Sequence, residues 1–188
     1  EVKQVMNVSN PSNVSTTGDV HYVGALEQTI APIEYKELVL DNVSKKTMGG
    51  DVKVTEQLYI SPSAKLGGGN DYNVMTITAT GENAVVYKGK FEAGNSIFEY
   101  VGDGETTVAA MPYYTLALTD VDVVRAETDG VVSLTSVTPN PSMGSPRTLS
   151  TDGIVGVAGN MYTSSTASYT VDGSTVEFNG NEQQEIPE

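Results

Sequence analysis

Apolar residues alternate with polar residues in short runs along most of this chain, and no stretch keeps a 3.6-residue apolar period. The run 34–40 is typical, because Leu38 and Leu40 stand two residues apart and would share one face of a strand. Gly, Asn, Asp and Ser, which favour turns, are abundant, as are the strand formers Val, Thr and Tyr. The pattern therefore predicts an all-β protein.

A segment of nineteen residues recurs after 78 positions without a gap. The sequence YVGALEQTIAPIEYKELVL at 22–40 aligns with YVGDGETTVAAMPYYTLAL at 100–118, since 100 − 22 = 78, and nine positions are identical. A third copy places Phe178 under Tyr100, since 178 − 100 = 78, and ends within the motif. We interpret residues 1–188 as one repetitive domain with copies beginning near 18, 96 and 174, the third incomplete.

Each copy reads as an aromatic strand, a turn at glycine and two further strands. Gly24 occupies the turn in the first copy, where glycine can adopt a positive φ at no steric cost. Tyr22, Tyr35, Tyr100 and Tyr113 recur with the motif, so we expect them to pack inside the scaffold. Leu38 and Leu116 should face the same interior.

A shorter spacing lies within the 78 residues. Strand anchors fall at steps of 20, 19, 20, 19, 18, 20 and 22 residues, which indicates four coils of about 20 residues in each copy. These anchors are Leu38, Leu58, Ile77, Ile97, Leu116, Leu134, Ile154 and Val176. Coils of this length favour a parallel β-solenoid, in which each coil stacks on its neighbours. An antiparallel β-sandwich remains the alternative.

The residues of the first copy resemble a known kind of repeat. Gln28-Thr29-Ile30, Lys46-Thr47-Met48 and Gly50-Asp51-Val52, with Tyr35 and the leucines that follow it, resemble repeats of large secreted and cell-surface proteins of the Bacteroidetes type. The likeness covers about 50 residues and recurs in part at 96–118 and 174–188, whereas 119–173 depart from it. The resemblance implies a β-helix-like fold and an extracellular, adhesive role, and it carries over no catalytic residue.

The charge balance excludes several partners. A formal net charge of −14 with only ten Lys plus Arg argues against nucleic acid and against anionic lipid. A divalent cation such as calcium is left open as a counter-charge. The chain has no cysteine, no apolar run long enough for membrane insertion, and it begins at Glu1 without Met. We expect a mature or excised piece of a secreted or cell-surface protein.

Candidate catalytic groups are few. His21 is the only histidine, and its counterparts Glu99 and Glu177 indicate a solvent-facing strand position. Paired carboxylates, which glycosidase chemistry needs, occur at Asp103 with Glu105 and at Asp120 with Asp122, but 24 acidic residues produce such pairs by chance. The only arginines, Arg125 and Arg147, lie near no convincing acidic cluster. We assign no catalytic, cofactor or metal residue and expect that the chain is not an enzyme.

Two further features, a glycine run and a set of tyrosines, could bind a ligand, and a third segment reads as a loop. Gly67-Gly68-Gly69-Asn70-Asp71 resembles one unit of a calcium-binding repeat, but a single unit favours a plain turn. Thr138–Pro146 reads as a protruding loop, because its prolines cannot donate to a ladder. Six tyrosines outside the motif could stack on sugar rings. These are Tyr59, Tyr72, Tyr87, Tyr114, Tyr162 and Tyr169.

The two ends of the chain suggest how it could assemble. The third copy stops before its Tyr-x-x-Leu-x-Leu half, and the segment 1–6 resembles 34–39, which belongs to that half. No cap is evident at either end, and uncapped solenoid ends are templates for another chain. We therefore expect an extracellular structural or adhesive protein, a fibre or stalk subunit that contacts copies of itself end to end. The alternatives are a carbohydrate-binding module and, third, a polysaccharide-degrading β-helix enzyme.

Overall fold

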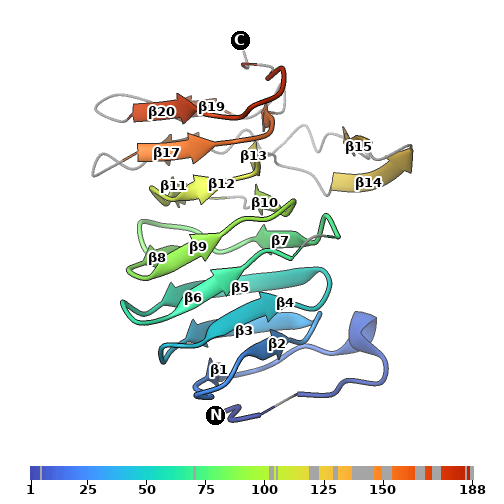
Figure 1. The fold of residues 1–188 in the computed structure, drawn as a ribbon, viewed down its shortest axis with the longest axis vertical. Coiled ribbons are helices and arrows are strands. Elements are labelled where there is room, and N and C mark those ends of the chain that lie inside the picture. The colour runs from blue at the N-terminus through green and yellow to red at the C-terminus, as the bar shows by residue number, and fades with distance from the viewer. Residues whose placement is uncertain are drawn as a thin grey trace.

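The chain winds into a parallel β-solenoid whose strands stack coil upon coil, with the N-terminus at one end of the stack and the C-terminus at the other (Figure 1). This computed structural model describes residues 1–188 except 5, 70, 102–103, 105, 119–122, 129–130, 137–145, 150–153, 164–167, 171–174, 185 and 187–188. Within this part the only helix is the short 3-10 turn η1 (Pro11–Asn13). The predicted parallel β-solenoid is confirmed, and the antiparallel sandwich is not the fold.

The strands form parallel sheets that run along the stack. The longest sheet contains β1 (Asp19–Tyr22), β3 (Glu34–Leu40), β5 (Val52–Ile60), β7 (Val74–Ile77), β10 (Ile97–Tyr100), β13 (Thr115–Leu118) and β18 (Met161–Thr163), with β8 (Val85–Tyr87) beside β5. A second sheet contains β2 (Gln28–Ile30), β4 (Lys45–Met48), β6 (Lys65–Gly67) and β9 (Lys90–Glu92). Two shorter sheets follow, made of β11 (Thr106–Val108), β16 (Pro146–Leu149) and β19 (Ser168–Thr170), and of β12 (Pro112–Tyr113), β17 (Ile154–Val157) and β20 (Thr175–Phe178).

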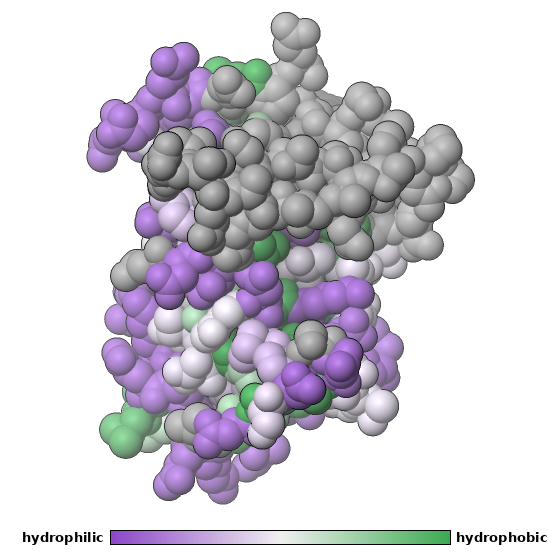
Figure 2. Space-filling model, turned by 90° about the vertical axis from the view of Figure 1, so that its right-hand side faces the viewer, coloured by the Kyte–Doolittle hydropathy of each residue, from purple (hydrophilic) through white to green (hydrophobic). Residues whose placement is uncertain are grey.

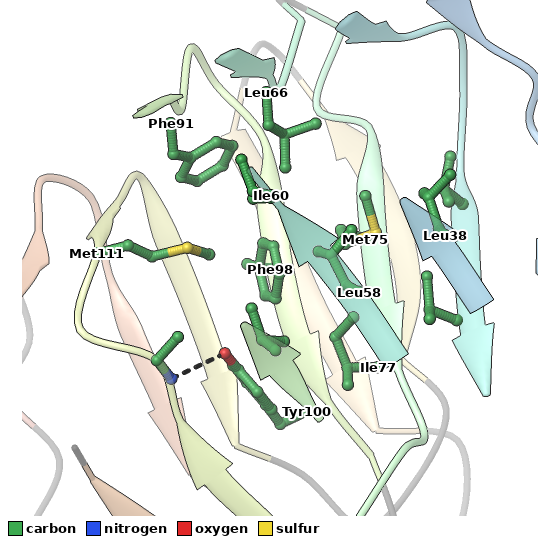
Figure 3. Close-up of a cluster of buried hydrophobic side chains, with 14 of the residues drawn as sticks. Leu38, Leu58, Ile60, Leu66, Met75, Ile77, Phe91, Phe98, Tyr100 and Met111 are labelled. Carbon is green, nitrogen blue, oxygen red and sulfur yellow. Dashed lines mark hydrogen bonds between the residues drawn. The ribbon is translucent and has the colours of Figure 1, made fainter. Parts of the chain in front are cut away.

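Apolar side chains of successive coils meet in one interior, as Figure 3 shows for ten labelled residues. Leu38 and Leu116, from equivalent positions of the repeat, are both 0% exposed. Leu38 lies beside Leu58 in the next coil, so a stripe of buried side chains continues from strand to strand. Burial of this apolar stripe is the main force that holds a solenoid without disulfides together.

Two tyrosine pairs confirm that the repeat has structural meaning. The Tyr22 and Tyr35 hydroxyl oxygens lie 2.8 Å apart, and those of Tyr100 and Tyr113 lie 2.9 Å apart. In each copy the first tyrosine accepts the main-chain N–H of an alanine, Ala31 at 3.0 Å or Ala109 at 3.1 Å. The second tyrosine donates to the carbonyl of the same alanine. Equivalent tyrosines therefore occupy equivalent, fully buried environments.

The glycine at the turn is needed for space and not for a positive φ. Gly24 is absent from the residues with positive φ, but a Cβ there would collide with the Gln28 side chain and the Lys3 carbonyl. The Gln28 amide accepts the Gly24 N–H at 2.7 Å and donates to the Val2 and Gln4 carbonyls. Our interpretation of this turn was therefore wrong in mechanism, although it placed the turn correctly.

The third copy repeats these glutamine side-chain hydrogen bonds at the other end of the stack. Gln184 accepts the Gly180 N–H at 2.9 Å and donates to the carbonyls of Val157 and Gly159. Because Gln28 and Gln184 are two repeats apart (184 − 28 = 156 = 2 × 78), the motif keeps its register into the incomplete copy. Val157 lies beneath Phe178 as Val2 lies beneath Tyr22.

The second copy corrects the predicted coil count. From β1 the long sheet takes four steps to β10, as expected for four coils. Among the described residues, only three steps lead from β10 to β20: Tyr100 lies beside Leu118, Tyr113 beside Val157, and Val157 beside Phe178.

A hairpin takes up the chain length of the missing coil. Strands β14 (Val123–Thr128) and β15 (Val131–Ser136) pair antiparallel and stand beside the stack (Figure 1). The anchor expected at Leu134 is therefore wrong, because Leu134 pairs with Arg125 in this hairpin. The predicted loop Thr138–Pro146 lies outside the described residues except for Pro146, which begins β16.

At the N-terminal end, residues that precede β1 pack against the stack. Val2, Met6 and Val8 pack against the core, and Ser15 bridges Glu34 at the start of β3. Val2 does not lie where the likeness of 1–6 to 34–39 predicts, because it lies beside Tyr22, on the opposite edge of β1 from Leu40.

Candidate functional site

The residues that could carry catalysis are dispersed. His21 is half-buried on β1, and Glu177 on β20 is exposed, as predicted for a solvent-facing position. Glu99 departs from this, because it is only 2% exposed and accepts a hydrogen bond from the Thr76 hydroxyl at 3.3 Å. The expectation of a solvent-facing residue is therefore wrong at Glu99.

The other candidates are only partly described. Asp103, Glu105, Asp120 and Asp122 lie outside the described residues, as do the side chains of the two arginines. Among the residues that the structure describes, no three His, Cys, Asp or Glu side chains gather closely enough to hold a metal ion.

The glycine run after β6 is more tightly packed than a plain turn. A Cβ at Gly67 would collide with the Lys45 side chain, and one at Gly68 with the Ala93 carbonyl and Ser96. Gly69 has a positive φ of 79°, and Asn70 lies outside the described residues. The run therefore lets neighbouring coils approach closely, which is a packing role.

A buried lysine shows how the scaffold holds a cation without an acidic cluster. Lys46 is 0% exposed, and its Nζ donates to the carbonyls of Gly24 and Ser44, each at 3.1 Å, and to the Ser44 hydroxyl. Burial lowers the pKa of Lys46, and Asp41 partly opposes this. These bonds join two coils, so we interpret Lys46 as structural.

The tyrosines that do not belong to the repeat lie nearer the surface. Tyr59, Tyr72, Tyr87 and Tyr114 are half-buried, whereas the side chains of Tyr162 and Tyr169 are not among those described. Of the described tyrosines, Tyr87 lines a cleft beside its strand β8, whose pairing is unusual. β8 pairs with β5 along one edge, and along the other edge no strand of the described residues pairs with it.

The cleft beside β8 has a volume of about 240 Å³. Its lining combines an aromatic ring, an amide and both charge signs, contributed by Glu82, Asn83, Tyr87, Lys88, Thr107 and Ala109. Burial raises the pKa of the Tyr87 hydroxyl, so this ring is partly withdrawn from water. Such a mixture could bind sugar hydroxyls beside an aromatic face. Sequence reasoning named Tyr87 but missed its neighbours, because the cleft arises where the ladder is interrupted.

The C-terminal end of the stack is a second candidate surface. β20 pairs with β17 on one side, and no strand of the described residues covers its other side. Val176 and Phe178 are half-buried and pack against the core from this end. Their counterparts in the first copy, Val20 and Tyr22, lie beneath Leu38 and Leu40 of the next coil.

The remaining surface is mostly polar. Figure 2 shows hydrophilic residues over most of the described part of one face, with small hydrophobic areas between them. Leu26 and Val43 are the most exposed large apolar side chains near the N-terminal end, at 81% and 69%. In the described residues, no helix has the length and apolar character needed to cross a membrane.

Comparisons with protein-family models, with curated proteins and with solved structures give no significant match to this chain.

Proposed function

We propose that this chain is a structural and adhesive element of an extracellular or cell-surface protein, a rigid shaft that extends by adding coils at its ends. The observation that supports the proposal is the uncovered strand β20. It has the register of β1, and Tyr22 of β1 is buried under the next coil, whereas among the described residues no coil lies above Phe178, which is half-buried.

The backbone of β20 supports the same proposal. Asn179 N–H donates to the Val157 carbonyl, so Glu177 and Asn179 face β17, and the N–H and C=O groups of Val176 and Phe178 face away from it. A strand edge with free donors and acceptors and an adjacent apolar surface is a template for another strand. The occupant we propose is another copy of the chain, or a further repeat of the same type.

At the N-terminal end, the strand pairing below β1 matches the strand pairing below β20. Val2 lies beneath Tyr22 as Val157 lies beneath Phe178, so residues 1–4 hold the position of a preceding coil. A secreted or surface location is proposed from the resemblance of the repeat.

Light scattering and electron microscopy of the purified protein over a range of concentrations test the proposal. We expect filaments, or particles that lengthen with concentration. Val176→Lys should suppress them, because it places a charge at the uncovered edge, whereas Leu26→Lys, on an exposed corner, should not. Wild-type protein that stays monomeric at high concentration would contradict end-to-end assembly.

The cleft beside β8 favours the second candidate, a carbohydrate-binding module. A glycan array tests it directly, with Asn83→Ala and Tyr87→Ala as variants and Tyr59→Ala as the matched control outside the cleft. Binding that both cleft variants abolish and the control retains would support this candidate. Binding that is equal in all three variants would exclude the cleft.

A further inference from the structure

Three of the eight lysines of this acidic chain stand in one column. Lys45 lies beside Lys65, and Lys65 lies beside Lys90, on the consecutive strands β4, β6 and β9. They face outward, because their sequence neighbours Lys46, Leu66 and Phe91 face the interior and are buried. With strands about 4.8 Å apart, the column spans about 10 Å along the stack.

Two lysines of the long sheet are each paired with one acid. Lys36 contacts Glu56 at 3.3 Å and Lys53 contacts Glu34 at 3.1 Å, both between β3 and β5. Among the described residues, Lys65 and Lys90 make no ion pair. Like charges on directly opposed strand positions destabilise a sheet, so the column costs stability that the paired lysines do not.

One carboxylate already binds within the column. Lys45 Nζ lies 2.6 Å from Glu92 Oε2, and Gly67, which has no side chain, leaves the passage through which Lys45 crosses β6. The hydrogen bond from Lys45 lowers the pKa of Glu92, with smaller contributions from the charges of Lys65 and Lys90. Three positive charges against this one negative charge leave two uncompensated.

We propose that this column binds an anionic polysaccharide, whose carboxylate or sulfate groups contact Lys65 and Lys90 as Glu92 contacts Lys45. Thr29 and Thr47 stand in the adjacent outward column, which continues through Gly67 to Glu92, and their hydroxyls can bond to sugar hydroxyls. The column is too narrow for nucleic acid, which requires many more basic contacts. This proposal does not depend on end-to-end assembly.

Binding to polygalacturonate and to dextran sulfate, with neutral dextran as the reference, tests the proposal. We expect the anionic polymers to bind and the neutral polymer not to bind. The double variant Lys65→Gln/Lys90→Gln should weaken binding about tenfold, and added salt should weaken binding by wild-type protein. The double variant Lys36→Gln/Lys53→Gln removes the same charge from already paired positions and should bind as wild type does.

Glu92→Gln gives a result in the opposite direction. Removing the internal carboxylate frees Lys45, so affinity for the anionic polymers should rise several-fold, which loss of folding could not produce. Equal weakening by both lysine double variants, or no gain with Glu92→Gln, would overturn the proposal. Tighter binding to double-stranded DNA than to either polysaccharide would overturn it as well, and so would self-association that requires Lys65 and Lys90.

Discussion

At the scale of single residues, a tyrosine hydroxyl accepts a hydrogen bond from a main-chain amide at the corner of the coil. Tyr22 and Tyr100 each accept an alanine N–H nine residues later, at a position that is buried and that no neighbouring strand pairs. In the third copy Phe178 has no hydroxyl, and the residue nine positions later is Pro187, which has no N–H. In the sequence of this copy, donor and acceptor are therefore lost together.

Tyr100→Phe tests this interpretation. The substitution removes the acceptor for the Ala109 N–H and the partner of the Tyr113 hydroxyl while keeping the ring. We expect the free energy of unfolding to fall by about 1–3 kcal/mol, which is the cost of leaving a buried hydrogen-bond donor without an acceptor. Urea denaturation followed by circular dichroism measures it. Tyr59→Phe, on the outer face of β5, is the control and should change stability by less than about 0.5 kcal/mol.

What the sequence could predict at this scale depended on its period. The 78-residue offset identified the environments of Tyr22 and Tyr100, because a repeated side chain in a stacked fold meets a repeated neighbour. The lysine column did not follow from any fixed offset, since 65 − 45 = 20 and 90 − 65 = 25. Because the coils differ in length, the residues that lie side by side can be worked out only once the register of the strands is known.

At the scale of elements, corners decide how closely coils can stack. Gly89 lies between β8 and β9, where a Cβ would collide with the carbonyl oxygens of Ser61 and Ala64 in the coil below. The Lys88 and Lys90 amides donate to the Ile60 and Ala64 carbonyls at 3.0 Å each, so the corner cannot move away without breaking the ladder. Glycine is required there by space.

Gly89→Ala should therefore lower the free energy of unfolding by about 1–3 kcal/mol, as overpacking does. Gly18→Ala is the matched control, because no atom lies within 4 Å of a Cβ at Gly18 and its φ is not positive. Thermal unfolding of the two variants beside wild type measures the difference. Equal effects of the two substitutions would show that the approach of the two coils is not limiting.

The hairpin β14–β15 shows why the strand at Leu134 was predictable and its partner was not. Alternating runs at 123–128 and 131–136 have the same period of two as any coil strand. That period records which face is buried and does not record whether the neighbour is parallel or antiparallel. The anchor at Leu134 was therefore placed on a strand correctly and in the wrong sheet.

At the scale of the whole molecule, buried tyrosines make the solenoid less stable as the pH rises into the alkaline range. Burial is the largest cause that raises the pKa of Tyr35 and Tyr113 above the ordinary value of 10.0, and it raises the pKa of Tyr100 to about 12. Above pH 10 the unfolded chain loses protons that the folded chain retains. Their contribution is therefore fully present below pH 10 and is lost as the pH rises beyond it.

We expect stability to fall by about 1.4 kcal/mol per pH unit for each of these tyrosines above pH 10, until the chain unfolds cooperatively. Without a disulfide, no covalent bond opposes this unfolding. A pH titration that records tyrosinate absorbance together with the β-sheet circular dichroism signal measures it. The buried tyrosines should ionise only as the β-sheet signal disappears. Ionisation of all ten tyrosines with that signal intact would show that these rings are not held in a closed interior.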